Sequence, residues 1–544
     1  MKRREKVFPM VLFSMAAHWF VSCYRAARKI RGYAFFRVGN SCRPQHISSP
    51  DPSVTRSCPL KGGAQTLLCD IQGSLLRSPS FFPFFMLVAF EGGNPLRALL
   101  LLLSFPLIWL LGNQNELSLR IMVLITFCGL RTRDMDTVVR AVLPKFYLES
   151  LNLHSYEVLA SAAKRVVLTS LPRVMVEGFL REHLGVSDVV GAELQVVGGY
   201  YTGFASRGAS MAVKHKAIKD LFGNSKPDVG LVSSCNPHDH LLVSHCKEIY
   251  VVNEQQSRSS GAGSLMPRGK YPKPLVFHDG RLAFLPTPLA AVSLFLWLPL
   301  GLTLAIVRAL IGIVLPYNAA IIAGALTGVH LRVQGLSNMD TTTTIKSTRS
   351  ARGNKGVLYA CNHRTLLDPI MVGTALGKPV TAVTYSLSKM SELIAPVKTV
   401  RLTRNRERDA DTMRRLLDEG DLIVCPEGTT CREPYLLRFS SLFAELADDI
   451  VPVAVDTKVS MFHGTTATGL KWLDPVFFLM NPWAEYRVEF LGRVPPELTC
   501  AGGCTGWDVA NRIQRQLADA LGFGCTTLTR KDKYLMLAGN EGGG

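Results

Sequence analysis

Acidic side chains are scarce in this sequence. Of its 544 residues, 42 are Asp or Glu and 61 are Lys or Arg, which leaves a formal net charge of +19. Such an excess favours nucleic acid as a partner, or else an anionic membrane surface or phosphorylated substrates. Zinc-finger, helix-turn-helix and aromatic RNA-binding motifs are all missing, so we expect no nucleic acid partner. The mean hydropathy is positive, which is high for a soluble protein and favours a membrane.

The 13 cysteines are scattered and form no pattern typical of a metal site. Cys500 and Cys504 are the closest pair, and no histidine accompanies them at metal-ligand spacing. The odd count and the long gaps argue against a disulfide framework, which favours a reducing compartment for the functional face. We expect no resident metal and no cofactor.

A histidine and an aspartate follow a short apolar run. The run, Val357 to Ala360 after Gly356, is typical of a buried strand. His363 and Asp368 lie in the segment that leaves this run, where catalytic groups are often found. A histidine beside a carboxylate can take the proton of a hydroxyl and so make it nucleophilic. Such pairs also occur by chance on surfaces, so the prediction depends on the segments that follow.

A second apolar run and polar loop follow the first. Residues 422–425 read as a strand that leads into Pro426-Glu427-Gly428-Thr429. Gly428 allows a close approach of the backbone or a positive φ. Residues 450–455 are another short apolar strand.

Several arginines accompany these two loops. Alternation over an extended strand at 400–408 puts Arg404 and Arg406 on one side. Arg432 and Arg438 could offer planar guanidinium groups to a phosphate. Taken alone, Arg401, Arg404 and Arg406 would form a solvated basic face. Because they lie between two loops of this kind, we expect at least one of them to bind phosphate.

In this order, His-x4-Asp, the arginine segment, Pro-Glu-Gly-Thr and Val-Pro-Val resemble the four blocks of the glycerolipid acyltransferase superfamily. The blocks cover about residues 356–456. The longer sequence segments at 362–369 and 426–439, and the tail at 530–540, resemble the land-plant sn-2 glycerol-3-phosphate acyltransferases. Four ordered blocks are far more specific than any single one. The resemblance implies a glycerolipid acyltransferase α/β domain at 331–544.

The resemblance also implies roles for the matching residues. His363 would be the general base on a hydroxyl of glycerol-3-phosphate, which then attacks the thioester of acyl-CoA. Asp368 would orient His363 and stabilise its charge. Direct transfer needs no covalent acyl-enzyme, so Cys361 need not act as a nucleophile. The residues implied for the acceptor site and its phosphate are Arg401, Arg404, Glu427, Gly428 and Thr429.

The best membrane segment lies at residues 286–330. Arg308 divides it into two halves, each of which approaches the ~20 apolar residues needed to span a bilayer. Two spans in a hairpin, or one span plus a re-entrant half, both fit, and Pro299 and Pro316 would bend or break the helices. A buried helix pair in a soluble core is disfavoured by the near absence of charge. The shorter run at 99–111 fits an interfacial or a buried helix.

We expect residues 1–63 to be a basic targeting or anchor region and a linker. Residues 1–50 carry ten Lys or Arg and a single acid, Glu5. Such a start resembles a signal anchor or an organelle transit peptide, and no clear small-residue cleavage site is present. We expect a multi-pass protein of the endoplasmic reticulum membrane, with the mitochondrion as the alternative.

Residues 64–255 form a further domain. Its start resembles the Asp-x-Asp-Gly-Thr-Leu opening of haloacid-dehalogenase-type phosphatases, and residues 165–170 resemble their second block. The resemblance implies a Rossmannoid fold in which Asp70 is the nucleophile on phosphorus and Thr169 takes the phosphate-binding position.

Three positions of this domain depart from the phosphatase pattern. Gln72 replaces the second aspartate, and an amide cannot donate and retake a proton as a carboxyl does. Ser234 and His238 replace the late acids that help to hold Mg²⁺, a hard cation that prefers oxygen ligands. We therefore expect no Mg²⁺ binding and a degenerate phosphatase domain, whose acyl product keeps its phosphate.

Taken together, the residues and the resemblance predict a membrane enzyme of the α/β class. It would acylate glycerol-3-phosphate, at the sn-2 position by resemblance, to lysophosphatidic acid for glycerolipid or cutin and suberin synthesis. Acyl-CoA, glycerol-3-phosphate and membrane lipids are its expected partners. The alternatives are a lysophosphatidic acid acyltransferase, a bifunctional enzyme that releases 2-monoacylglycerol, and a non-catalytic membrane scaffold.

Overall fold

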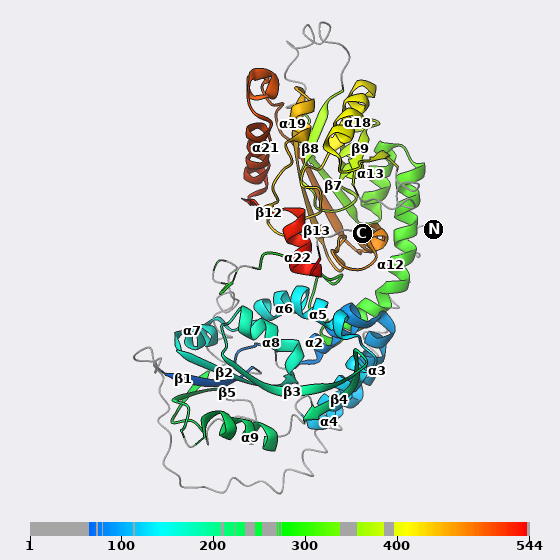
Figure 1. The fold of residues 1–544 in the computed structure, drawn as a ribbon. Coiled ribbons are helices and arrows are strands. Elements are labelled where there is room, and N and C mark those ends of the chain that lie inside the picture. The colour runs from blue at the N-terminus through cyan, green and yellow to red at the C-terminus, as the bar shows by residue number, and fades with distance from the viewer. Residues whose placement is uncertain are drawn as a thin grey trace, which may run out of the picture. The chain divides into compact units, whose positions relative to one another are not determined.

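The computed structural model describes residues 65–71, 74–78, 80–112, 115–207, 211–223, 225–233, 245–252, 269, 271–273, 275–337, 356–385 and 396–540. Two compact units make up the chain (Figure 1). The first contains residues up to Leu275 together with Leu285–Leu296, and the second contains Val276–Phe284 together with Trp297 onward. The predicted targeting region at 1–63 lies outside the described residues.

The first unit is built on a six-stranded sheet with the order β4-β3-β2-β1-β5-β6. Its strands are β1 (Thr66–Asp70), β2 (Lys164–Pro172), β3 (Asp188–Val197), β4 (Tyr200–Arg207), β5 (Val229–Ser233) and β6 (Glu248–Val252). All neighbours are parallel except β3 and β4. In Figure 1, α6 (Leu143–Ser150) and α8 (Arg173–Glu182) lie on one side of the sheet and α9 (Met211–Phe222) on the other. This arrangement confirms the predicted Rossmannoid fold.

Helices fill the chain between β1 and β2. They include α2 (Phe82–Leu87), α3 (Pro95–Leu111), α4 (Glu116–Phe127), α5 (Thr132–Ala141) and α7 (Leu153–Ser161). Helix α3 covers the apolar run predicted at 99–111. Leu101 and Phe105 are buried on one side of it, whereas Leu103 and Leu107 are exposed on another. A row of exposed leucines fits an interfacial helix better than a fully buried one.

The second unit contains a seven-stranded sheet with the order β10-β9-β11-β8-β13-β14-β7. Its strands are β7 (Val329–Gln334), β8 (Leu358–Cys361), β9 (Thr381–Thr384), β10 (Lys398–Arg401), β11 (Leu422–Val424), β13 (Ile450–Val459) and β14 (Ala484–Phe490). The strands predicted at 357–360, 422–425 and 450–455 are confirmed as β8, β11 and β13. Because β8 and β11 are parallel neighbours, the loops that leave them meet at one edge of the sheet.

Helices cover both faces of this sheet. They are α16 (Asp368–Leu376), α18 (Arg406–Glu419), α19 (Leu442–Leu446), α20 (Asp474–Leu479), α21 (Gly506–Leu521) and α22 (Arg530–Ala538). One buried cluster joins the sheet to α18, α19 and α21, and a second joins its other face to α16 and α20. The amphipathic helix predicted at 508–521 is confirmed, with Val509, Ile513 and Leu517 buried.

The strand predicted over 400–408 is wrong beyond its first two residues. Strand β10 ends at Arg401, Arg404 has a φ of 67°, and α18 begins at Arg406. The buried Asp409 carboxylate accepts the backbone N–H of Arg404 at 2.9 Å, and Asn405 caps the helix. These two side chains stabilise a turn and a helix start, which outweighs the alternating pattern.

Helix α12 (Pro288–Val314) has 27 residues and is, within the described part of the chain, the one helix long and apolar enough to cross a membrane. It continues through Pro299, and the chain breaks at Pro316. Helix α13 (Tyr317–Leu326) has 10 residues. At 1.5 Å per residue it is about 15 Å long, half the ~30 Å of a bilayer core. Two full spans therefore do not fit this segment, and one long helix plus a short one does.

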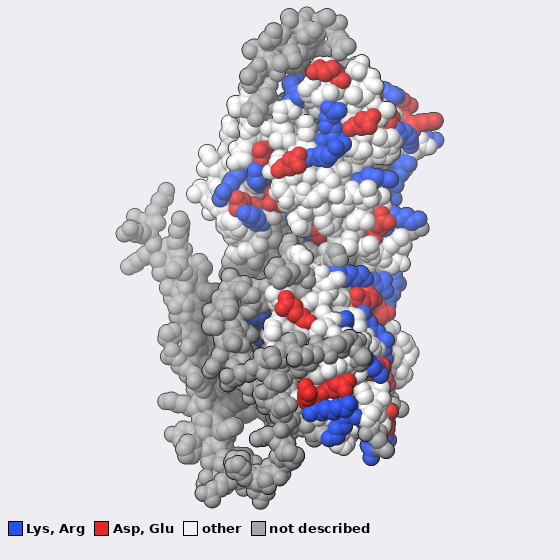
Figure 2. All heavy atoms as spheres, turned by 90° about the vertical axis from the view of Figure 1, so that its left-hand side faces the viewer, with Lys and Arg blue, Asp and Glu red and all other residues white. Residues whose placement is uncertain are grey.

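The surface charge of the described residues is mixed on the face drawn in Figure 2. Blue Lys and Arg atoms alternate there with red Asp and Glu atoms, and wide areas carry neither. Ten basic residues of the whole sequence belong to 1–50, outside the described part. The excess of positive charge is thus not gathered into one field on this face.

Candidate active site

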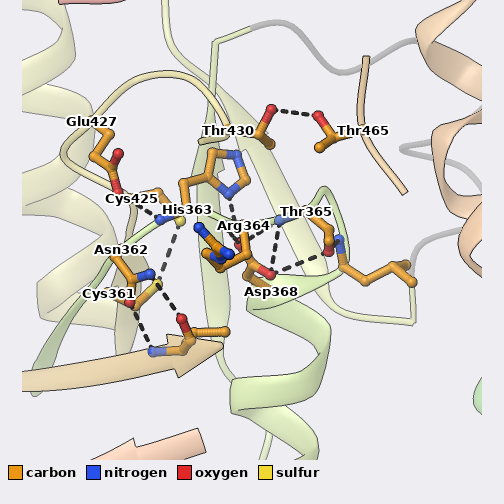
Figure 3. A network of polar contacts seen from close by, with 12 residues as sticks. Cys361, Asn362, His363, Arg364, Thr365, Asp368, Cys425, Glu427, Thr430 and Thr465 are labelled. Carbon is orange, nitrogen blue, oxygen red and sulfur yellow. Dashed lines mark hydrogen bonds and ion pairs between the residues drawn. The ribbon is translucent and has the colours of Figure 1, made fainter. Parts of the chain in front are cut away.

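His363 and Asp368 form a direct contact at the carboxyl end of β8. His363 Nδ1 lies 2.9 Å from Asp368 Oδ2 (Figure 3). Asp368 opens α16 and is fully buried, while the His363 side chain is 15% exposed. Asn362 exchanges two hydrogen bonds with the backbone of Val455 on β13, which fixes the start of the loop. The sequence-predicted pair is therefore assembled, with one ring nitrogen of His363 committed to the carboxylate.

The Asp368 carboxylate is held by several further donors. Its Oδ2 accepts the backbone N–H of Arg364 at 2.5 Å and of Thr365 at 2.9 Å. Its Oδ1 accepts the hydroxyl of Tyr486 at 2.8 Å. Burial, together with the charge of Asp368, raises the pKa of Tyr486 well above its usual value, so the hydroxyl stays a donor. These donors stabilise the charged carboxylate and set its orientation toward His363.

A cavity of about 1020 Å³ opens beside His363. Its apolar lining comes from α12, α13, α16 and α20 and includes Leu302, Ile306, Ile313, Ile321, Ile370, Met371, Val476 and Leu479. Its polar lining includes His363, Glu427, Gly428, Thr429, Thr430, Arg438, Thr465, Lys471, Arg530 and Tyr534. A long apolar space with polar groups near a histidine fits a substrate that has a hydrocarbon chain and a charged head.

Glu427 is buried and uses both carboxylate oxygens within the protein. Oε1 accepts the backbone N–H of His363 at 2.8 Å, and Oε2 accepts that of Leu437 at 3.1 Å. Burial raises its pKa to about 7, against the opposing effect of these two hydrogen bonds. Gly428, with a φ of +65°, forms the turn that follows, and Thr429 is buried beside it. Glu427 therefore holds the backbone of the loop that carries His363, and because it also lines the cavity, its part in an acceptor site stays a prediction.

The two arginines predicted for the acceptor phosphate lie outside the cavity lining. Arg401 ends β10 with an exposed side chain. Arg404 is also exposed, but its charge acts on Arg530 and Tyr385, which both line the cavity. Arg404 thus lies close enough for its charge to act on two residues of the cavity lining.

Arg432 and Glu433 are used in packing. Arg432 contacts Asp279 at 3.4 Å and donates to the carbonyl of Gly280 at 3.0 Å. Glu433 lies 3.0 Å from His278 Nδ1, and its pKa falls to about 2 because this neighbour outweighs the effect of burial. Both partners belong to Val276–Phe284, so this segment is part of the second unit. The Arg432 guanidinium is therefore engaged in packing contacts and is not offered to a phosphate.

The cavity contains basic residues that motif reasoning missed. Lys471 and Arg530 line it, as does Tyr534. Lys471 lies outside the four blocks. For Arg530 and Tyr534, the one feature of the sequence that pointed to them is the resemblance of the tail at 530–540. Arg438, singled out in the sequence, also lines the cavity, with its guanidinium 5.6 Å from the centre of the Trp507 ring.

The first unit brings together the two described residues of the phosphatase-like site. Asp70 ends β1 beside Leu168 of the parallel strand β2, next to Thr169. The Thr169 hydroxyl accepts the backbone N–H of Leu171 at 3.0 Å. Gln72, Ser234 and His238 lie outside the described residues. No group of three or more His, Cys, Asp or Glu able to hold a metal occurs in the portion of the chain that the structure describes.

Comparisons with known proteins agree with this architecture. The family described as "Glycerol-3-phosphate acyltransferase RAM2-like, HAD-like domain" matches residues 66–252, and the "Acyltransferase" family matches residues 330–456. Glycerol-3-phosphate acyltransferase 1 of Arabidopsis thaliana is 52% identical over 573 residues, which covers 96% of each chain. The chain belongs to the glycerol-3-phosphate acyltransferase family. The resemblance drawn from the motif blocks is thereby confirmed.

A second sequence relative agrees with this assignment. Glycerol-3-phosphate acyltransferase RAM2 of Petunia hybrida is 46% identical and covers 87% of this chain and 97% of its own. A solved 1-acyl-sn-glycerophosphate acyltransferase, PlsC of Thermotoga maritima, matches 38% of this chain and 76% of its own at 13% identity and a TM-score of 0.26. The assignment to the family rests on the sequence relatives.

Proposed function

We propose that this acyltransferase moves an acyl group from acyl-CoA to a hydroxyl of sn-glycerol-3-phosphate, at the sn-2 position, and so forms lysophosphatidic acid. The observation that carries the proposal is the His363–Asp368 pair, at 2.9 Å, on the wall of a cavity with both an apolar and a cationic part. The scaffold alternative would require no such pair, and it is not favoured.

The reaction follows from the free nitrogen of His363. Since Nδ1 contacts Asp368, Nε2 is left to take the proton of the acceptor hydroxyl. The hydroxyl oxygen then forms a bond to the thioester carbonyl carbon, and the carbon–sulfur bond breaks. The imidazolium returns the proton to the leaving CoA thiolate. Asp368 stabilises the imidazolium meanwhile, and no acyl-enzyme is formed.

The remaining residues support this chemistry in different ways. Glu427 positions the backbone of His363, and the turn at Gly428 and Thr429 shapes the acceptor end of the cavity. Arg404 would attract anionic substrates toward the cavity through its charge. No resident metal or cofactor takes part in the proposed steps.

Membrane attachment is part of the proposal. Helix α12 exposes Leu300, Ile306 and Leu310, and α13 exposes Ile322 and Leu326. Apolar surface of this extent is costly in water and would be covered by lipid. We place the enzyme at the endoplasmic reticulum, with the mitochondrion as the alternative, and its product in glycerolipid or cutin and suberin synthesis.

The phosphatase-like domain would not remove the phosphate. Gln72, Ser234 and His238 replace the groups that a phosphatase of this type needs for proton transfer and for Mg²⁺. Wild-type enzyme should therefore accumulate lysophosphatidic acid. Release of 2-monoacylglycerol that disappears in Asp70→Asn would instead favour the bifunctional alternative.

The deciding experiment uses the full chain in microsomes with labelled sn-glycerol-3-phosphate and acyl-CoA. Formation of 2-acyl product by the wild type, and its loss in a normally expressed His363→Ala variant, is the expected result. A parallel assay with lysophosphatidic acid as acceptor tests the second acceptor directly. If His363→Ala retained full transfer, the assignment of the base would be wrong.

A further inference from the structure

Lys471, Arg530 and Tyr534, here called the Tyr534 cluster, meet at the polar end of the cavity. Lys471 Nζ donates to the Tyr534 hydroxyl at 2.6 Å and lies 4.6 Å from the centre of its ring. The Arg530 guanidinium lies 4.8 Å from the same centre. All three line the cavity that contains His363. Two cations are thus gathered round one phenol, although Lys471 and Arg530 are 59 positions apart in the sequence.

The Tyr534 cluster is tied to the catalytic loop. Helix α22, which carries Arg530 and Tyr534, also carries the buried Lys533, whose ammonium donates to the carbonyl of Thr430. The next residue, Cys431, donates its backbone N–H to the carbonyl of His363 at 2.7 Å. The packing of α22 on this loop therefore fixes the cluster relative to the catalytic histidine.

Two acids near the Tyr534 cluster are engaged in other contacts, and Lys471 is left without one in the described part of the chain. Lys471 has no ion-pair partner within the described portion of the chain. The acid nearest in sequence on α22, Asp532, accepts from Thr529 in a capping box. Glu433, whose pKa responds to Lys533, is paired with His278. An anion that entered the cavity would therefore meet a Lys471 ammonium that is not paired with a carboxylate among the described residues.

The pKa of the Tyr534 phenol responds to the positive charge of its neighbours. Burial, followed by the charge of Arg404, lowers the pKa of Arg530. Burial alone would raise the pKa of Tyr534, but the hydrogen bond from Lys471 and the charges of Lys471 and Lys533 outweigh it and lower the pKa. The lowered pKa of Tyr534 and the effect of Arg404 on Arg530 both reflect positive charge, which an anionic ligand would offset.

We propose that the Tyr534 cluster binds a phosphate group of a substrate, with Lys471 and Arg530 as its cationic ligands. The proposal rests on the proposed function, since both substrates carry phosphate. The acceptor phosphate is the favoured source, because the cluster is tied to the loop that holds His363, and the acceptor must present its hydroxyl and its phosphate together. The phosphates of CoA share this chemistry, and the experiment below distinguishes them from the acceptor phosphate. The role implied for Arg401 and Arg404 passes to residues outside the motif blocks.

Steady-state kinetics of the full chain in detergent micelles test the proposal. Lys471→Met and Arg530→Gln should each raise KM for sn-glycerol-3-phosphate about tenfold, equal to ~1.4 kcal/mol, and leave KM for acyl-CoA nearly unchanged. Lys531→Met is the matched control, because Lys531 is exposed on the same helix and does not line the cavity. A rise only in KM for acyl-CoA would assign the cluster to the phosphates of CoA. Unchanged KM values for both substrates would overturn the proposal.

Binding without turnover separates this proposal from the proposed function. His363→Ala should still bind sn-glycerol-3-phosphate in calorimetric titrations, and Lys471→Met in that background should bind it about tenfold more weakly. Tyr534→Phe keeps the ring but removes the hydroxyl that orients Lys471, so it should weaken binding less than Lys471→Met. Equal affinity in all three variants would exclude the cluster, even if the wild type transfers acyl groups as proposed.

Discussion

The carboxylate of Glu427 accepts the backbone N–H of His363 at 2.8 Å. Its other oxygen accepts the backbone N–H of Leu437 at 3.1 Å, so one buried side chain joins the loop after β8 to the chain beyond β11. His363 is therefore held from two directions, by Asp368 at its ring and by Glu427 at its backbone.

Glu427→Gln should alter the pH dependence of stability. Because burial raises the pKa of Glu427 to about 7, its carboxyl favours folding while protonated. This contribution is fully present below the ordinary pKa of the side chain and is lost as the pH rises to about 7. The unfolding temperature of the wild type should thus fall relative to Glu427→Gln over this window. Parallel curves for the two proteins in detergent would contradict the assignment.

Asp368→Asn should abolish most activity without unfolding the protein. The amide keeps the shape of the side chain but presents an N–H where Arg364, Thr365 and His363 all need an acceptor. By analogy with catalytic triads, kcat should fall by about 10³ to 10⁴, with little change in KM. Tyr486→Phe removes a single donor to Asp368 and should cost about tenfold or less in kcat. Comparable losses in the two variants would argue for a merely structural role of Asp368.

The sequence predicts those parts of the site that depend on local patterns, and misses those that depend on contacts between separate segments. The strands before His363 and Glu427 are readable because short apolar runs bounded by polar loops carry their own signal. The turn at Arg404 cannot be predicted in this way, because it is stabilised by a hydrogen bond from the Arg404 backbone N–H to the Asp409 carboxylate in α18. The loops that carry His363 and Glu427 meet because the parallel strands before them end at the same edge of the sheet.

The Tyr534 cluster lies beyond such reasoning for a different reason. Lys471 and Tyr534 come together through the packing of α22 on the loop after Glu427, and no periodic pattern encodes that contact. Arg432 likewise meets Asp279 across 153 positions, so its side chain is committed to packing although its sequence surroundings favour a phosphate ligand. Only the folded chain shows that Arg432 has a carboxylate partner.

Arg308→Met should loosen α12 from the acyltransferase fold. The Arg308 guanidinium donates to the carbonyls of Leu479 and Asn481, both at 2.6 Å, and also to that of Thr327. Loss of these contacts leaves buried carbonyls unpaired, which should cost about 2 to 4 kcal/mol. Because α12 lines the cavity, KM for long-chain acyl-CoA should also rise. Leu310→Met, on an exposed side of the same helix, is the control for thermal unfolding and for KM.

Arg404→Gln should separate attraction of the substrate from direct binding. Arg404 is exposed and lies outside the cavity lining, yet its charge acts on Arg530 within it. Exposed charges are screened at ~0.15 M salt, so the variant should raise KM for sn-glycerol-3-phosphate about twofold at low salt and less at high salt. Arg530→Gln should keep its larger effect at both salt concentrations, because a direct contact in a partly buried site is screened much less. If Arg404→Gln instead raised KM about tenfold at high salt, Arg404 would be a phosphate ligand, as the motif blocks imply, and the part given to Arg530 would need to be shared with it.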